Sequence, residues 1–158
     1  MPAASGIEHR WSDILGAYVQ VGVASGSVVS VRFLDEPSDD SDERGEGEGS
    51  DPLRAVFAYL SGEVATTPDV DYALTVSGVE RRALERTRDV PYGTTTTYSD
   101  FAASVGEGDE DGVARVREAL HDNPVPVVLP SHRVVDGSGV GGFAGPRRVK
   151  EFLLELEG

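Results

Sequence analysis

Hydrophobic and polar residues alternate through residues 16–34, GAYVQVGVASGSVVSVRFL, on both sides of the small-residue centre ASGS. Alternation with a period of two around a glycine-containing turn predicts a β-hairpin that buries one face. The pattern becomes helical in the stretch DPLRAVFAYLSGE. There Asp51 is the expected N-cap, Pro52 suits the first helical position, and Gly62 ends the helix. The first part of the chain therefore predicts strands followed by a helix.

The segment between these elements, residues 35–51, is acidic and rich in glycine. It offers few apolar side chains to bury, so a mobile loop is expected. Beyond the first helix, VDYALTV at 70–76 predicts a short strand, and GVERRALERTRD at 78–89 predicts a helix. Residues 1–76 are therefore expected to form a small α+β unit, and residues 77–158 a mostly helical one.

Two helices with a tight loop between them are predicted in the second unit. Thr97 and Asp100 have the spacing of a capping box at the start of the first helix, which continues to about residue 105. The loop GEGDED precedes a second helix at 111–122, which the sequence NP ends. This arrangement is typical of a helix-turn-helix, although most such pairs only pack together. Apolar residues with helical spacing then predict a C-terminal helix, at Val149, Phe152, Leu153 and Leu156.

The chain is strongly acidic. Its 158 residues carry a formal net charge of −14, and 13 of its 14 basic residues are arginine. Such a net charge keeps a protein soluble, but the like charges repel one another. At an ionic strength of 1 M, salt screens this repulsion beyond a distance of about 3 Å. We therefore predict a halophilic source; the alternative is an ordinary acidic protein with an acidic loop. The same charge opposes nucleic-acid binding, which normally needs a basic face.

Composition also excludes several kinds of site. The chain contains no cysteine, which excludes disulfides, thiolate zinc sites and thiol nucleophiles. Three scattered histidines do not suggest a metal cluster, so neither a metal nor a cofactor is expected. No apolar run reaches the roughly 20 residues of a membrane span. The N-terminal residues lack the pattern of a signal peptide, and a cytoplasmic protein without membrane contact is expected.

A serine and a histidine stand side by side in the segment NPVPVVLPSHRVVDGSGVGGFAG, residues 123–145. With a carboxylate such as Glu157, Ser131 and His132 provide the residue types of a hydrolytic triad. However, neighbouring residues in an extended segment point to opposite sides, and the G-x-S-x-G elbow of many hydrolases is absent. The plain alternative is a turn that follows a strand at 125–129.

The same segment resembles a known family when it is taken together with VPYGTTTTYSDFA upstream and KEFLLELEG downstream. This set of motifs is similar to that of the O6-alkylguanine-DNA alkyltransferases, closely over residues 77–158 and only in pattern over 1–76. The resemblance implies an α+β fold with a ribonuclease-H-like N-terminal unit. A winged-helix-like DNA-binding domain, which contains the helix-turn-helix, would follow it. The resemblance also implies base flipping, because the O6 atom of guanine is out of reach inside a duplex.

The resemblance assigns roles to matching residues. Tyr98 would help to rotate the phosphate of the damaged nucleotide, and Asn123 would brace the turn before the active-site strand. His132 and Glu157 would deprotonate the reactive cysteine of the family through a water molecule. The other matching positions fall into two groups: Arg133 and Lys150 are structural, and Pro130, Phe143, Ala144 and Gly145 surround the flipped base and its alkyl group.

Two positions depart from the family pattern. Ser131 stands where the family has its alkyl-accepting cysteine, and a serine hydroxyl is a poor nucleophile toward saturated carbon. Alkyl transfer is therefore expected to be lost. Ala114 occupies the place of the arginine that fills the base stack after flipping. Arg115 follows it, so a shift of one residue or a rotation of the helix would restore an arginine there.

Three functions remain open. The first is that of the alkyltransferase-like branch, in which the cysteine is replaced. Such a protein, here expected to be a monomer, binds O6-alkylguanine in double-stranded DNA and marks it for nucleotide excision repair proteins. The second is a methylated-DNA–protein-cysteine methyltransferase-type enzyme with residual activity, or a Cys→Ser variant of one. The third is a non-catalytic structural or interaction module. A DNA function requires arginines on one face, for which the candidates are Arg115, Arg117, Arg133, Arg147 and Arg148.

Overall fold

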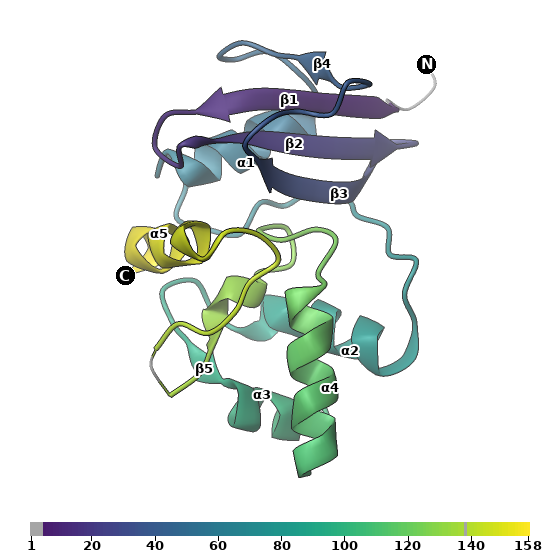
Figure 1. Cartoon of the computed structure of the whole chain (residues 1–158), viewed down its shortest axis with the longest axis vertical. Helices are drawn as coiled ribbons and strands as arrows, with labels where there is room; N and C mark the ends of the chain where they lie inside the picture. Colours follow the sequence, from purple (N-terminus) through teal and green to yellow (C-terminus); the bar gives the residue numbers. More distant parts are fainter. Residues whose placement is uncertain (1–4, 138) are drawn as a thin grey trace.

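A computed structural model describes residues 5–137 and 139–158, and within them the fold has a four-stranded sheet and five α-helices (Figure 1). This confirms the mixed α+β class. The sheet has the order β3-β2-β1-β4 and is antiparallel except for the β1–β4 pair. Its strands are β1 (Gly6–Ser12), β2 (Ala17–Ala24), β3 (Ser27–Leu34) and β4 (Asp42–Glu43).

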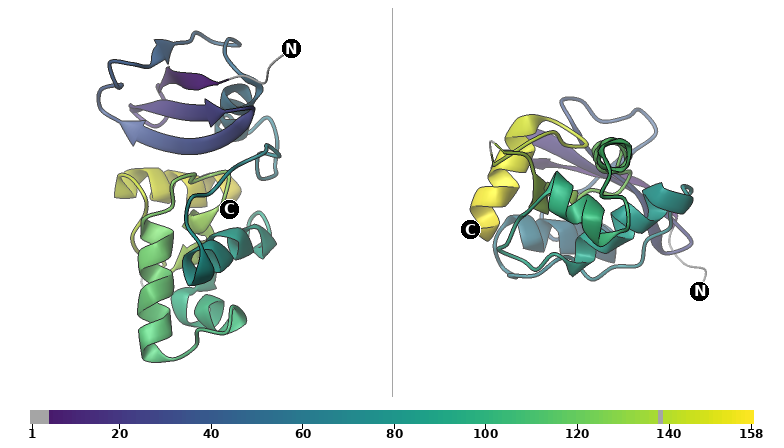
Figure 2. Two further views of the ribbon diagram at one scale, coloured as in Figure 1. Left: turned by 90° about the vertical axis from the view of Figure 1, so that its right-hand side faces the viewer. Right: turned by 90° about the horizontal axis from the view of Figure 1, so that it is seen from below.

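Helix α1 (Asp51–Leu60) packs against the sheet, and the other helices form the opposite end of the molecule (Figure 1). Among these, α5 lies next to the sheet, and α2, α3 and α4 lie beyond it (Figure 2). The helices of this end are α2 (Gly78–Arg86), α3 (Tyr98–Ser104), α4 (Glu110–His121) and α5 (Arg147–Glu157). Between them are the 3-10 turns η1 (Thr87–Asp89) and η2 (Ser131–Arg133) and the parallel pair β5 (Thr96–Thr97) and β6 (Val134–Val135).

The predicted hairpin is confirmed by β2 and β3. Ser25 and Gly26 have φ angles of 51° and 82°, as a tight two-residue hairpin turn requires. Strand β2 is buried along most of its length, because it lies between β3 and β1 in the sheet and Ser38 of the following segment contacts its Gln20. Strand β1 was not predicted, since its residues GIEHRWS do not alternate between apolar and polar types.

Residues 35–51 are tied to the sheet, which corrects the expected mobile loop. Within this segment β4 pairs with β1. Arg44 Nε donates to Glu8 Oε1 at 2.9 Å, and Gln20 Nε2 donates to Ser38 Oγ at 3.1 Å. Glu8 and Gln20 are buried polar residues of β1 and β2 that need hydrogen-bond partners. This segment is therefore ordered by its hydrogen bonds to buried polar residues of the sheet, and not by the burial of apolar side chains.

Two predicted strands are wrong. Residues 70–76 form only an isolated bridge, between Tyr72 and Val28, because this segment meets the sheet only at the start of β3. Residues 125–129 form a tight turn, in which Val127 has a φ angle of 77°. The N–H of Leu129 bonds to the carbonyl of Val125 at 3.0 Å, so the backbone pairs with itself rather than with a neighbouring strand.

The helix starts follow local capping rules. Thr97 accepts from the N–H of Asp100 at 3.2 Å, which confirms the predicted cap of α3. Asp109 accepts from the N–H of Gly112 at 2.6 Å and caps α4 in the same way. For α1 the cap is Ser50 rather than Asp51, a difference of one residue.

The two ends of the molecule share a continuous core. The N–H of Val31 in β3 bonds to the carbonyl of Pro124 at 2.9 Å. Arg148 of α5 donates to the carbonyls of Leu15 and Gly16 at the β1–β2 turn. The proposed boundary between residues 76 and 77 therefore separates two units in close contact. In the described part of the chain, no helix has the length and apolar character to cross a membrane.

Candidate functional site

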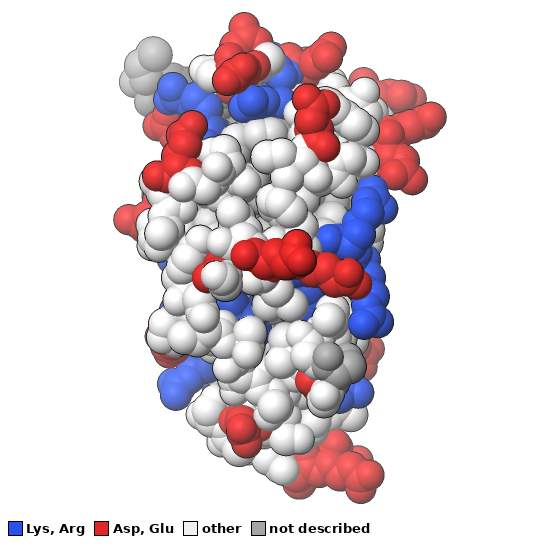
Figure 3. All heavy atoms as spheres, turned by 90° about the vertical axis from the view of Figure 1, so that its left-hand side faces the viewer, with Lys and Arg blue, Asp and Glu red and all other residues white. Residues whose placement is uncertain are grey.

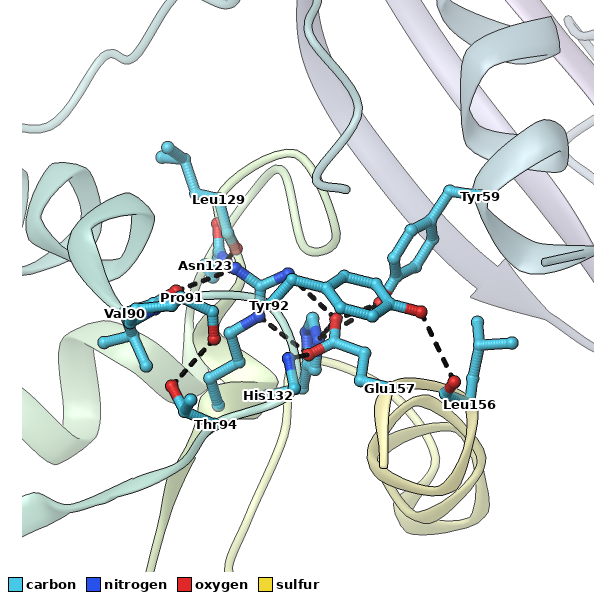
Figure 4. Close-up of polar contacts among 12 residues, drawn as sticks. Tyr59, Val90, Pro91, Tyr92, Thr94, Asn123, Leu129, His132, Leu156 and Glu157 are labelled. Atoms are coloured by element: carbon cyan, nitrogen blue, oxygen red, sulfur yellow. Dashed lines mark hydrogen bonds and ion pairs between the residues drawn. The ribbon is translucent and has the colours of Figure 1, made fainter. Parts of the chain in front are cut away.

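The last turn of α5 carries a buried carboxylate that several side chains surround (Figure 4). Arg133 donates to both oxygens of Glu157, through Nε at 2.8 Å and a terminal guanidinium nitrogen at 2.9 Å. His132 Nε2 lies 2.7 Å from Glu157 Oε2, and the hydroxyl of Tyr59 donates to the same oxygen. Residues from α1, η2 and α5 thus meet at one buried point.

The charges of this cluster follow from its burial and its hydrogen bonds. Burial alone would raise the pKa of Glu157, but hydrogen bonds from His132, Arg133 and Tyr59 hold that pKa well below its usual range. Burial lowers the pKa of His132, and this outweighs the opposite effect of Glu157. At neutral pH an ionised carboxylate therefore faces a neutral imidazole. An ionised carboxylate only accepts hydrogen bonds, so the imidazole proton lies on Nε2 and Nδ1 carries a lone pair.

Ser131 precedes His132 in η2, but the two side chains have different partners. Asn123 Nδ2 donates to Ser131 Oγ at 3.0 Å and to the carbonyl of Leu129 at 2.8 Å. Asn123 Oδ1 accepts from the N–H of Val125 at 2.9 Å. Among the described residues, Nδ1 of His132 is the buried side-chain atom that has no hydrogen-bond partner. The geometry is therefore not that of a serine hydroxyl bonded to its base, which the hydrolase hypothesis requires.

The turn that precedes Ser131 depends on Asn123. Replacing Asn123 with alanine is expected to lower the free energy of unfolding by about 1–3 kcal/mol, because the buried N–H of Val125 loses its partner and the carbonyl of Leu129 keeps only the N–H of Ser131. Urea unfolding at constant salt would measure the change. Asp122→Ala, at the exposed neighbouring position, serves as control and should change stability by less than about 0.5 kcal/mol. Equal unfolding midpoints for the two variants would contradict this role.

A second polar cluster surrounds Tyr98 at the start of α3. The Tyr98 hydroxyl lies 3.1 Å from His121 Nε2 and 3.4 Å from Lys150 Nζ. Lys150 also donates to two backbone carbonyls, at 2.7 and 2.9 Å. The guanidinium of Arg117 lies over the Tyr98 ring, 4.7 Å from its centroid. Burial lowers the pKa of Lys150 to about 8, so at neutral pH this lysine stays largely protonated beside Arg117.

The residues expected to surround a flipped base fall into two groups, one that lines a cleft and one that is buried. The loop Phe143–Gly145 lines a cleft of about 610 Å³, together with β3, His121 and Asn123. The Phe143 ring packs 6.0 Å from the ring of Phe33, measured between centroids. Pro130 is buried, as is Ser131. The cleft therefore opens between β3 and the segments 121–124 and 143–145, and neither Pro130 nor Ser131 is among its lining residues.

Known proteins are similar to this chain in sequence and fold. The family model for the DNA-binding domain of 6-O-methylguanine DNA methyltransferase matches residues 78–158. The chain belongs to this family. It is 37% identical over 122 residues to the methylated-DNA–protein-cysteine methyltransferase of Methanopyrus kandleri, covering 71% of this chain and 90% of the relative. The corresponding protein of Archaeoglobus fulgidus is 31% identical over 155 residues, which cover 94% of this chain and 96% of the relative.

Solved structures of the family superpose over nearly the whole chain. The Mycobacterium tuberculosis O6-methylguanine methyltransferase matches with a TM-score of 0.76 and 25% identity, covering 96% of this chain and 92% of that one. The Mycobacterium tuberculosis OGT in complex with DNA matches with a TM-score of 0.76 and 26% identity, covering 95% and 92% of the two chains. The family fold thus includes the sheet end as well as the helical end.

The arginines that were candidates for one DNA-binding face have different partners within the molecule. Arg133 is buried against Glu157. Arg115 forms an ion pair with Glu107 at 2.9 Å, while Ala114 beside it is exposed. Of the remaining candidates, Arg147 pairs with Glu151 at 3.2 Å and Arg148 contacts the β1–β2 turn, whereas Arg117 lies on Tyr98.

Sequence reasoning did not predict two sets of contacts in these clusters, although it named Arg117 as a candidate for the DNA-binding face. Tyr59 contacts Glu157 from a position 98 residues earlier, and no local pattern indicates that contact. Arg117 and His121 flank Tyr98 from α4. Their spacing of four residues places them on one helix face, which is a signal that the sequence contains.

Proposed function

We propose that this protein recognises O6-alkylguanine in double-stranded DNA and holds the flipped base without removing the alkyl group. The observation that carries the proposal is the position of Ser131. Its hydroxyl, which we assign to the family's acceptor position, accepts from Asn123 beside a cluster in which Glu157 contacts both His132 and Arg133. The surroundings of the family's acceptor are thus retained while the sulfur is absent.

Chemistry supports recognition rather than transfer. The family reaction breaks the bond between guanine O6 and an alkyl carbon and forms a bond from that carbon to a thiolate sulfur. Neutral His132 can accept a proton through Nδ1, but a serine hydroxyl is far less acidic than a thiol. An alkoxide at Ser131 is therefore not formed to a useful extent. A hydroxyl can still donate a hydrogen bond to a bound base.

The Tyr98 cluster supports DNA binding by so acidic a protein. Arg117 and Lys150 place two positive charges around Tyr98, although the whole chain carries −14. On the face shown in Figure 3, acidic side chains lie at both ends of the molecule and also across its middle, and a group of basic side chains follows one edge beside the middle. Local positive charge of this kind can bind DNA phosphates when salt screens the repulsion from the acidic side chains.

The finer features of the fold belong to the same proposal. We infer that α3 and α4, which residues 105–109 join, are a helix-turn-helix whose second helix follows the minor groove. The helical end from residue 77 would be the winged-helix-like DNA-binding domain and residues 1–76 the ribonuclease-H-like unit. A monomer in the cytoplasm of a halophile, which hands the lesion to nucleotide excision repair proteins, is the biological setting that we propose.

Lesion-dependent binding tests the proposal. Duplex oligonucleotides that contain O6-methylguanine are expected to bind at least tenfold more tightly than the same duplex with guanine, a difference of about 1.4 kcal/mol. The measurement is fluorescence anisotropy in multimolar KCl, the condition that the acidic surface suits. Equal and weak affinity for the two duplexes at every salt concentration would contradict the proposal and favour the structural or interaction module.

Residual alkyl transfer is the second candidate, because the His132–Glu157 pair remains in contact. After incubation with a duplex that contains O6-methylguanine, intact-protein mass spectrometry is expected to show no added methyl group. A stoichiometric mass gain that maps to Ser131 would replace the recognition proposal with the enzymatic one.

A further inference from the structure

Helix α4 carries two exposed arginines with different surroundings. Arg115 is fixed by Glu107, which also pairs with Arg82 at 3.2 Å. The central guanidinium carbon of Arg117 lies over the Tyr98 ring, 4.7 Å from its centroid, which is within cation–π distance. Among the acidic side chains of the described chain, none forms an ion pair with Arg117. Arg117 can therefore leave its position by giving up one stacking contact, whereas Arg115 must break an ion pair.

Helix geometry assigns the two arginines to different faces. At 3.6 residues per turn, Ala114 and His121 lie on the same face of α4, and Arg117 lies between them at i+3 from Ala114. Contacts agree with this, since both His121 and Arg117 meet Tyr98. Arg115 lies near the start of α2, where it lines a pocket with Ser77, Val79 and Glu80. A rotation of α4 that brought Arg115 to the Tyr98 face would separate it from Glu107.

We propose that Arg117 is the residue that enters the base stack when the damaged base is flipped out. This inference rests on the proposed function. Flipping leaves a gap in the stack that costs unstacking energy unless a planar group fills it. The guanidinium of Arg117 already lies over an aromatic ring, and it can exchange this contact with Tyr98 for a contact with the neighbouring base pair. Its place on the helix is about 4.5 Å further along the axis than Ala114.

The exchange also changes the surroundings of Tyr98. When Arg117 leaves the ring, that face of Tyr98 becomes accessible to the nucleotide whose phosphate it is proposed to contact. The Tyr98 hydroxyl keeps its neighbours His121 and Lys150. One movement of Arg117 therefore fills the stack and uncovers the tyrosine.

A comparison of duplex and single-stranded lesions tests this role, because only a duplex has a stack to fill. Arg117→Ala is expected to weaken binding to a duplex with O6-methylguanine roughly tenfold or more. Arg117→Lys keeps the charge but not the plane, and it should weaken binding to a similar extent. Binding of the same lesion in a single strand should change less than about threefold in both variants, as expected for one exposed charge at high salt.

Fluorescence of a 2-aminopurine placed beside the lesion gives a second readout, since its emission rises when the neighbouring base leaves the stack. The rise should be smaller with Arg117→Ala and unchanged with Arg81→Ala, a matched exposed arginine on α2. Arg115→Ala tests the competing residue. Loss of duplex binding in Arg115→Ala but not in Arg117→Ala would overturn the inference. Binding of the lesion duplex by Arg117→Lys as tightly as by the parent would also overturn it. Wild-type protein that does not distinguish the lesion would overturn the proposed function itself.

Discussion

Ser131→Cys is expected to convert the protein into one that takes the methyl group from O6-methylguanine in DNA. The thiol would lie beside Asn123 and next to His132, whose Nδ1 is unprotonated at neutral pH. A thiolate attacks saturated carbon far more readily than a hydroxyl does. The expected change is from no transfer to one methyl group per protein molecule.

Intact-protein mass spectrometry after incubation with a lesion duplex at high salt measures this gain, and peptide mapping should place it at position 131. Ser131→Ala is the matched control, which should bind the lesion and gain no mass. A cysteine variant that binds the lesion as the parent does and yet stays unmodified would show that the His132–Glu157 pair is not a competent base. In that case the chain lacks a functional base for the family reaction as well as the cysteine sulfur.

Glu157→Ala is expected to cause the largest loss of stability. It leaves the guanidinium of Arg133, whose side chain is 1% exposed, without its carboxylate. Breaking a buried ion pair by removing one partner costs about 3–5 kcal/mol, because the other charge stays buried and uncompensated. The tight network with Tyr59 and His132 loses its central acceptor in the same step.

Urea unfolding at constant KCl concentration measures this loss, with Glu155→Ala as an exposed control on the same helix that should shift stability by less than about 0.5 kcal/mol. The pH dependence has a definite sign. The folded-state pKa of Glu157 lies below its usual value of 4.5, so its contribution is present above that pH and is lost as the pH falls toward the folded value. Equal acid sensitivity of Glu157→Ala and the parent would contradict this account.

Local chemistry in the sequence is sufficient for several features. Alternation of residue types and the Ser25–Gly26 turn specify the hairpin, and Thr97 specifies where α3 begins. The motifs from residue 77 onward specify the family, and the serine in PSHR indicates that the cysteine sulfur of the family reaction is missing. These features depend on neighbours within about one helical turn, or on a contiguous run of residues, so they can be recognised without coordinates.

Contacts between distant residues were decided only by the tertiary structure. Tyr59 reaches Glu157 across 98 residues of chain, and Glu8 orders the acidic segment through Arg44, 36 residues away. Residues 70–76 and 125–129 have the composition of strands, but a strand needs a partner edge, and the fold offers them none of sufficient length. The sequence alone is therefore enough to specify the family and the absence of any cysteine. The fold decided which polar groups meet, and on α4 it placed Arg117 rather than Arg115 beside Tyr98, because helix faces are set by packing and ion pairs that no local pattern records.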